Sequence, residues 1–354
     1  MSGIVGDNVD DGSGVIKASV GGATISASDP ATDTNATLGT QWANSTSGEY
    51  FVCTDATTDE NVWTNVGDGT GDIFNYSFQG TVSGYASGGG SSTNIIDKFS
   101  LSSDGDASDV GNLTVGRYMP AGQLSTTHGY TSGGGGTTTN VIDKFSFSSD
   151  GDATDVGDIT VSRWGASGQS SITHGYTAGG NEPAINVIDK FSFSSDGDAT
   201  DVGDITVSRH GQAGQTSTTH GYSSGGNDGY YTDEIDKFSF SSDGDATDVG
   251  NIATRGYTTG QSSSTHGYTS GGHTSTDIID KFSFSSDGDA TDVGDLTVPR
   301  FGPSGQSSTT YGYASGGKTP ASDVIEKFSF SSDGDATDIG DITVARDYLS
   351  GTQY

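Results

Sequence analysis

The chain has 354 residues, with 46 acidic and 14 basic side chains and a formal net charge of −32. This charge argues against a nucleic-acid binder, because affinity for phosphate comes mainly from Lys and Arg. The single cysteine, Cys53, excludes an internal disulfide and a multi-thiolate zinc site. The sequence has no apolar run of the roughly 18 residues that a membrane span needs, so we expect a soluble protein without membrane insertion.

The first 72 residues do not repeat. Residues 1–40 are mostly Gly, Ser, Asp, Ala and Thr, which predicts an extended arm. Three short strand patterns follow, around Trp42, over 47–53 and around Trp63, and they predict a small β module over residues 41–72. We expect Trp42 and Trp63 to lie in the core of this module.

The module resembles the short β modules of bacteriophage tail fibres and other virion appendages. In those modules Gly-x-x-Trp, Gly-x-x-Tyr and a closing Trp alternate with turns. Here Gly39-Thr-Gln-Trp42 matches the first of these, Ser47-Gly-Glu-Tyr-Phe-Val-Cys53 stands in the place of the second with one residue fewer between Gly48 and Tyr50, and Trp63 is the closing Trp. The opening Ser2-Gly-Ile-Val-Gly-Asp-Asn8 is similar to the start of marine phage structural proteins. The resemblance implies a virion protein that is made in the host cytoplasm, exposed on the particle and attached to other virion proteins through its N-terminal arm.

A repeat fills the rest of the chain. Gly-Tyr recurs six times, and its tyrosines, which are 45 or 46 residues apart, are Tyr85, Tyr130, Tyr176, Tyr222, Tyr268 and Tyr313. Each copy contains four short β patterns separated by Gly, Asp and Ser, and no helical periodicity. A period of about 46 residues with four strands is the size of a propeller blade. The sequence therefore predicts an all-β protein with a six-bladed β-propeller over residues 73–354.

Two basic residues recur once in each copy. They are Lys98, Lys144, Lys190, Lys237, Lys281 and Lys327, and Arg117, Arg163, Arg209, Arg255, Arg300 and Arg346. A charge that recurs in every blade is more typical of a local partner for nearby carboxylates than of an anion site. For closing the ring, the segment Ile73-Phe-Asn-Tyr-Ser-Phe78 is a candidate clasp against the fourth strand of the last blade.

The copies also resemble the kelch repeat. Gly133-Gly134, the following Val141-Ile-Asp-Lys-Phe145 and Arg163 stand where that family has its double glycine, third strand and arginine. The resemblance covers all six copies and implies a kelch-like propeller. The family's tryptophan after the third strand is missing, and Asp150-Gly-Asp-Ala-Thr-Asp155 stands in that region, with a partial similarity to the Asp-box turn of sialidases.

Variation among the six copies is confined to one predicted face. The loop between the second and third strands changes in length and identity, and the crossover after each repeated arginine begins with a different, usually aromatic residue. Loops on a rigid scaffold commonly carry binding residues. The candidates for receptor or partner binding are Tyr118, Trp164, His210, Tyr230, Tyr231, Tyr257, His273, Phe301 and Lys318.

The opposite face repeats Ser-Ser-Asp-Gly-Asp-Ala-Thr-Asp almost unchanged. Carboxylates at this density could bind calcium, whereas Asp-Gly is also a common pair in tight turns, which is the interpretation that we favour. The candidate calcium ligands are Asp104, Asp106, Asp150, Asp152, Asp155, Asp196, Asp198, Asp243, Asp245, Asp287, Asp289, Asp333 and Asp335. No other cofactor is indicated.

Catalysis needs a single constellation of reactive groups, and here each reactive residue type recurs as part of the repeat. The sequence thus predicts a non-enzymatic phage virion appendage protein, of the fibre or receptor-binding type, whose loop face adheres to a glycan or protein on the host surface. The alternative is a capsid or tail decoration protein that binds no receptor. A homo-oligomer is compatible with either function.

Overall fold

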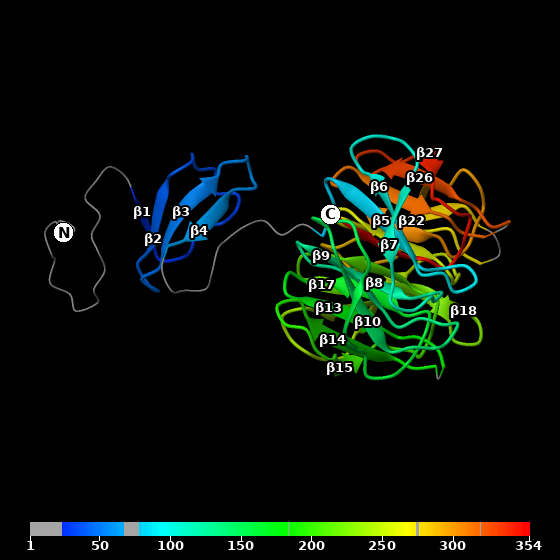
Figure 1. The fold of residues 1–354 in the computed structure, drawn as a ribbon. Helices are drawn as coiled ribbons and strands as arrows, with labels where there is room; N and C mark the ends of the chain where they lie inside the picture. The colour runs from blue at the N-terminus through cyan, green and yellow to red at the C-terminus, as the bar shows by residue number, and fades with distance from the viewer. Residues whose placement is uncertain (1–22, 67–77, 183, 274–275, 319) are drawn as a thin grey trace, which may run out of the picture. The chain divides into compact units, whose positions relative to one another are not determined.

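The computed structural model describes residues 23–66, 78–182, 184–273, 276–318 and 320–354. Contacts divide the chain into two units, Met1–Tyr76 and Ser77–Tyr354. The described residues form β-strands and no helix, so the predicted all-β class is confirmed (Figure 1).

The first unit contains one four-stranded sheet in the order β1-β2-β3-β4. Its strands are β1 (Thr24–Ser26), β2 (Gln41–Asn44), β3 (Tyr50–Asp55) and β4 (Val62–Asn65). Phe51, Cys53 and Trp63 are buried, and Trp42 packs edge-on against Trp63 at 5.9 Å between ring centroids. Both tryptophans therefore contribute to the core of the module.

The start of this module differs from the boundary predicted at residue 41. Strand β1, inside the predicted arm, pairs in parallel with β2. The Trp42 indole donates a hydrogen bond to the Ser28 carbonyl at 2.9 Å, and the Asn44 amide donates one to Asp29 at 2.7 Å. The module therefore takes in residues from 24 onward, and residues 1–22 of the predicted arm lie outside the described residues.

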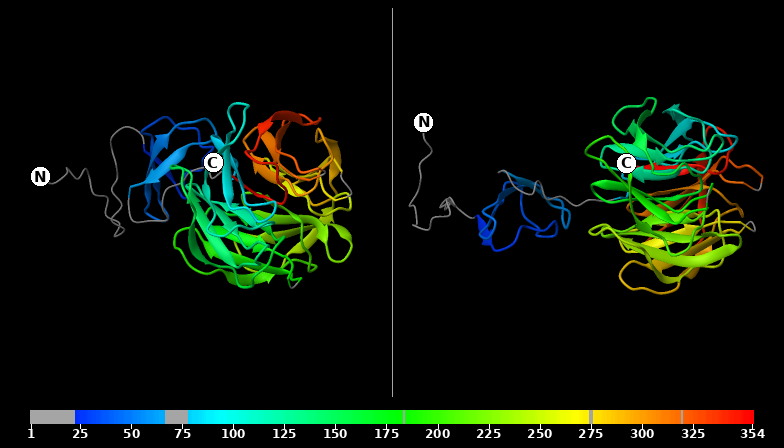
Figure 2. Two further views of the ribbon diagram at one scale, coloured as in Figure 1. Left: turned by 45° about the vertical axis from the view of Figure 1, so that its right-hand side comes forward. Right: turned by 90° about the horizontal axis from the view of Figure 1, so that it is seen from below.

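The second unit consists of six four-stranded antiparallel sheets in a propeller-like repeat (Figures 1 and 2). One sheet combines β28 (Ser350–Gln353) with β5 (Ser83–Ser87), β6 (Ile95–Ser100) and β7 (Ser108–Asn112). The next two are β8 (Ala121–Leu124), β9 (His128–Ser132), β10 (Val141–Ser146) and β11 (Thr154–Asp158), then β12 (Ser167–Ser170), β13 (His174–Ala178), β14 (Val187–Ser192) and β15 (Thr200–Asp204).

The other three sheets have the same order. They are β16 (Ala213–Thr216), β17 (His220–Asn227), β18 (Tyr231–Ser239) and β19 (Thr247–Asn251); β20 (Thr259–Ser262), β21 (His266–Ser270), β22 (Ile278–Ser283) and β23 (Thr291–Asp295); and β24 (Ser304–Ser307), β25 (Tyr311–Ser315), β26 (Val324–Ser329) and β27 (Thr337–Asp341). The third strand of each carries the β-branched and aromatic residues that suit a buried strand. Opposite its phenylalanine stands a glycine, and the far end of the Phe145 ring, for example, lies where a Cβ on Gly129 would be.

We call β8, β12, β16, β20, β24 and β28 the inner strands. Each contacts the next, and β28 contacts β8, so the six sheets follow one another around a common axis. Strand β28 pairs with β5 from Ser350 opposite Ser87 to Gln353 opposite Gly84. The C-terminal strand thus completes the sheet of the first repeat. The clasp considered at Ile73–Phe78 falls on the described residues only at Phe78. Residues 73–77 lie outside the described residues, and Phe78 lies against inner strands.

Six glycines, one from each inner strand, surround the axis at one level, which we call the waist: Gly122, Gly168, Gly214, Gly260, Gly305 and Gly351. A methyl group on Gly168 would lie 2.1 Å from the Gly122 carbonyl oxygen, and one on Gly122 would lie 2.4 Å from that of Gly351. Such distances are repulsive, so only glycine lets adjacent inner strands approach this closely.

Each sheet packs on the next through the repeated tyrosine. Tyr130 lies against Phe191 and Phe193 of the following sheet, with ring centroids 5.5 and 4.8 Å away. Tyr313 contacts Phe99 in the same way at 5.7 Å, across the junction between the last and the first repeat. The apolar core is therefore distributed over the six junctions between sheets.

The repeated basic residues also join neighbouring sheets. Each arginine reaches an acidic residue on the third strand of the next sheet, as in Arg163–Asp189 at 2.9 Å, and all six pairs are at most 4% exposed. Each lysine reaches the first carboxylate of the next Asp-rich turn, and these turn carboxylates are 54–60% exposed. The repeated arginines and the repeated lysines therefore pair with carboxylates, as the sequence predicted, and each carboxylate belongs to the adjacent repeat.

Burial raises the pKa of all six repeated tyrosines, to about 12 for Tyr85, Tyr222 and Tyr268. Below pH 10 their hydroxyls are neutral in both the folded and the unfolded chain. Above pH 10 the unfolded chain loses these protons first, so the stability that the tyrosines contribute is present in full below pH 10 and is lost as the pH rises through their raised pKa values.

We therefore expect two phases when tyrosinate absorbance at 295 nm is followed against pH. Part of the absorbance change should precede any loss of the β circular dichroism, and the part that comes from the repeated tyrosines should follow above pH 10, together with loss of the fold. Ionisation of all 15 tyrosines in one step near pH 10, with the fold retained, would contradict this packing.

Candidate functional site

The crossovers are the segments that join the last strand of each sheet, at the edge farthest from its inner strand, to the inner strand of the next sheet. They meet around the axis. The second residue after each repeated arginine donates its N–H to the carbonyl of its counterpart in the preceding crossover, at 2.5–2.9 Å. Six such bonds form a closed circle, because Met119 donates to Tyr348. We call these six residues the collar: Met119, Gly165, Gly211, Tyr257, Gly302 and Tyr348.

All six collar residues have a left-handed backbone conformation. Its φ angles are +66° to +71° in the three glycines, and +53°, +56° and +59° in Met119, Tyr257 and Tyr348. This conformation strains a residue with a side chain by about 1–2 kcal/mol. Three collar positions therefore carry side chains at a cost that glycine avoids in the other three.

An unbroken circuit of aromatic rings surrounds the collar. Its six members, one from each crossover, are Tyr118, Trp164, His210, Tyr257, Phe301 and Tyr348, and successive ring centroids are 4.9–6.4 Å apart. Tyr231 and His273, stacked on each other at 4.7 Å, join the circuit at Tyr257. We call these eight residues the aromatic rim. All of them are partly exposed.

The crossovers and the variable loops lie on one face, as the sequence predicted. Tyr118, Trp164, His210 and Phe301 each form a β-bridge to the loop between the second and third strands, as Trp164 does with Asn181. The backbone of each crossover is therefore held in place by a variable loop, and the aromatic side chains project from a fixed frame.

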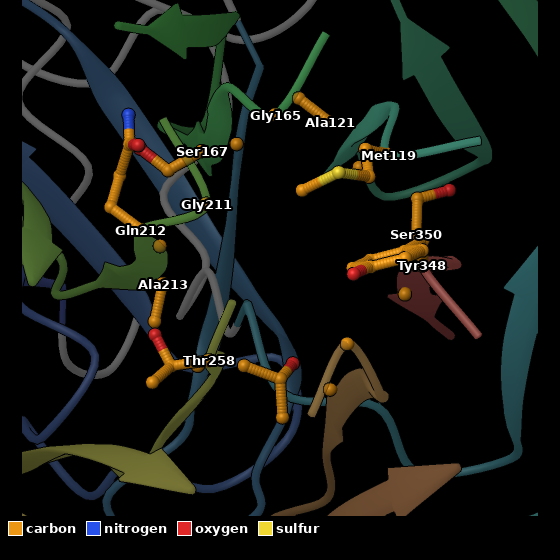
Figure 3. Close-up of a pocket in the computed structure, with 18 of the residues that line it drawn as sticks. Met119, Ala121, Gly165, Ser167, Gly211, Gln212, Ala213, Thr258, Tyr348 and Ser350 are labelled. Atoms are coloured by element: carbon orange, nitrogen blue, oxygen red, sulfur yellow. The ribbon is translucent and has the colours of Figure 1, made fainter. Parts of the chain in front are cut away.

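Inside the collar lies a cavity of about 100 Å³, which we call the cup (Figure 3). The collar forms its entrance and the glycine waist its floor, and Gln212, Thr258 and Ser167 are among the residues that line it. Figure 3 shows the thioether of Met119 and the phenol of Tyr348 pointing into the space. Among the described residues that line the cup there is no Asp, Glu, Lys, Arg or His.

Burial acts on the titratable groups of the rim and the cup. Burial lowers the pKa of His210, whose Nε2 lies 3.1 Å from the Tyr257 hydroxyl. Burial, followed by the neighbouring tyrosines, raises the pKa of Tyr257 and Tyr348. This surface thus offers aromatic area and neutral polar groups within a protein of net charge −32.

Seven of the nine predicted binding residues belong to the aromatic rim. Of the other two, Tyr230 stands at the tip of the β17–β18 hairpin and is 85% exposed. Lys318 forms the bridge to Phe301 and lies 3.6 Å from Asp347. Sequence reasoning missed Tyr348, although it stands two residues after Arg346 just as Tyr257 stands two after Arg255.

The candidate calcium ligands have protein partners. The first carboxylate of each Asp-rich turn binds a lysine of the preceding sheet, as Asp150 binds Lys98 at 2.9 Å. The second accepts a backbone N–H from the preceding sheet, as Asp152 does from Asn112 at 2.9 Å, and Asp155 accepts the N–H of Gly157. Among the described residues, no three His, Cys, Asp or Glu side chains form a group that could hold a metal. In this arrangement the turns join the sheets.

Comparison with known proteins does not assign the chain to a family. No protein-family model matches it, and no curated protein is similar to it. In the described part of the chain, no helix is long and apolar enough to cross a membrane.

Proposed function

We propose that residues 77–354 form a kelch-like, six-bladed β-propeller. Three closed circuits support this architecture: the contacts of the inner strands, the glycine waist and the hydrogen bonds of the collar. Each circuit has six members and includes a link between the C-terminal repeat and the N-terminal end of the unit.

We propose that the protein is a phage virion appendage that adheres to the host surface through the face bearing the aromatic rim. In this proposal the N-terminal residues, with the module, attach the chain to other virion proteins, as their resemblance to fibre modules implies. The observation that carries the binding role is the rim itself. Eight partly exposed aromatic residues on the most variable loops form one connected surface, and such residues commonly dominate interface energies.

The face with the Asp-rich turns is a poorer candidate for binding, because its turn carboxylates hold neighbouring sheets together. A decoration protein without a receptor is the second candidate. The exposed β17–β18 hairpin tip could equally pack against another virion subunit, and only the position of this face on the particle separates the two functions.

The experiment compares particles that carry either a triple variant of the aromatic rim face or a double variant of the Asp-rich turns. Trp164→Ala with Tyr230→Ala and Tyr231→Ala should reduce attachment to host cells at least about 30-fold, because aromatic anchors commonly contribute about 2 kcal/mol or more each. Asp150→Asn with Asp152→Asn should leave attachment intact and lower the melting temperature by a few degrees, mainly because the charge of Asp152 no longer strengthens its hydrogen bond from the Asn112 N–H, whereas the exposed Asp150–Lys98 pair contributes little.

Incorporation into particles and circular dichroism should be normal for the aromatic variant. Normal attachment of this variant, together with lost attachment of the Asp variant, would reverse the two faces and make the acidic turns the binding surface.

A further inference from the structure

The axial space is closed at the end opposite the rim. There Phe78 is only 4% exposed, and its carbonyl accepts a hydrogen bond from the Gln353 amide at 2.5 Å. Gln79 donates to the Ser308 carbonyl at 2.9 Å, and the Gly80 N–H to that of Ser307 at 2.7 Å. In the described part of the chain, Phe78 and the waist thus bound the axial space at this end, and the collar lies at the opposite end of the cup, next to the rim.

The lining of the cup suits a neutral, polar ligand. None of its described residues carries a charged side chain, so these residues offer no ion pair to a phosphate, a carboxylate or an ammonium group. Gln212 and Thr258 line it at 5% and 9% exposure, and the Gln212 Oε1 and Thr258 Oγ1 atoms have no hydrogen-bond partner. A buried polar atom without a partner is costly, and a ligand hydroxyl within reach would offset that cost.

The collar side chains provide the complementary apolar contacts. Met119 and Tyr348 point into the cup, and the Tyr257 hydroxyl is fixed by His210. Glycine occupies the same collar position, with the same backbone hydrogen bonds, in three of the six crossovers. The fold therefore does not need side chains at these positions, and their strain points to a ligand contact.

We propose that the cup binds a single ring of a neutral saccharide, which rests on the proposed adhesion function and names its ligand class. A sugar ring has apolar C–H faces that pack on Tyr348 and Tyr257, and hydroxyl groups that bond to Gln212, Thr258 and the exposed backbone of the inner strands. The volume of about 100 Å³ holds several waters, which one ring would displace. A longer glycan would continue outward over the aromatic rim.

The test uses the full chain and a panel of soluble probes: the methyl glycosides of glucose, galactose, mannose and N-acetylglucosamine, with tetramethylammonium chloride as the cationic probe. Saturation-transfer NMR detects binding at millimolar affinity. We expect at least one glycoside to bind. Tyr348→Gly should weaken it at least about 10-fold without lowering the melting temperature by more than a few degrees, because glycine relieves the strained backbone.

Tyr230→Ala is the matched control, since Tyr230 is exposed and lies outside the cup; it should leave glycoside binding unchanged. Binding of tetramethylammonium alone would overturn the saccharide assignment in favour of a cation cage, and so would glycoside binding that Tyr348→Gly leaves intact, by placing the sugar elsewhere. Absence of binding for every probe at about 100 mM would also overturn it. The proposed adhesion function would survive any of these results if the Trp164/Tyr230/Tyr231 variant still lost attachment.

Discussion

Deletion of residues 350–354 should abolish cooperative folding of the second unit. It removes β28, the inner strand of the sheet that contains the first repeat, and with it the Gly351 contacts to both neighbouring inner strands. Tyr354, which stacks on Phe147 at 5.3 Å and accepts N–H groups from residues 81–83, is also lost. We expect a loss of more than about 5 kcal/mol, which is most of the stability of a typical domain. Urea unfolding followed by tyrosine fluorescence measures it.

Deletion of residues 1–66 is the control. It removes a larger segment but only the first unit, so the second unit should keep its melting temperature within a few degrees. A chain lacking residues 350–354 that unfolds as cooperatively as the parent would show that β28 does not close the ring.

Asp189→Ala should cost about 3–5 kcal/mol, because it leaves the buried Arg163 guanidinium without its counter-charge. Asp189 is fully buried and accepts hydrogen bonds from the Thr160 N–H, the Thr160 hydroxyl and Arg163, at 3.0, 2.7 and 2.9 Å. Equilibrium unfolding in urea gives the difference in free energy from the parent.

The control is Asp243→Ala, which breaks the exposed pair that Lys190, next to Asp189 on strand β14, forms with the following sheet. Exposed pairs contribute about 0–1 kcal/mol, so this variant should be nearly as stable as the parent. Equal costs for Asp189→Ala and Asp243→Ala would contradict the role of the arginine column as the buried link between sheets.

The repeat made much of this fold predictable. A regular spacing of Gly-Tyr fixes the number of copies, and residues that vary together fall on the same face because successive strands reverse direction. Hence seven of the nine candidate binding residues are found in one connected aromatic surface. The all-β class and the four-stranded antiparallel sheets also follow from the local patterns.

Other features depend on partners far apart in the sequence. The pairing of β28 with β5 joins residues more than 260 positions apart, and the short Ser350-Gly-Thr-Gln353 has no local pattern that specifies its partner. The strand β1 was missed because Thr24-Ile-Ser26 has only one apolar residue. The backbone circle of the collar, which places Tyr348 at the cup, arises only when six crossovers meet.

The location of the aromatic rim on the intact particle tests the central claim most directly. An electron cryomicroscopy map at a resolution that places side chains would show which face of the second unit is turned outward. We predict that Trp164, Tyr230 and Tyr257 face solvent and that the first unit contacts other virion proteins. A map in which the aromatic rim is buried against a neighbouring subunit would contradict adhesion through this face and assign the protein to decoration.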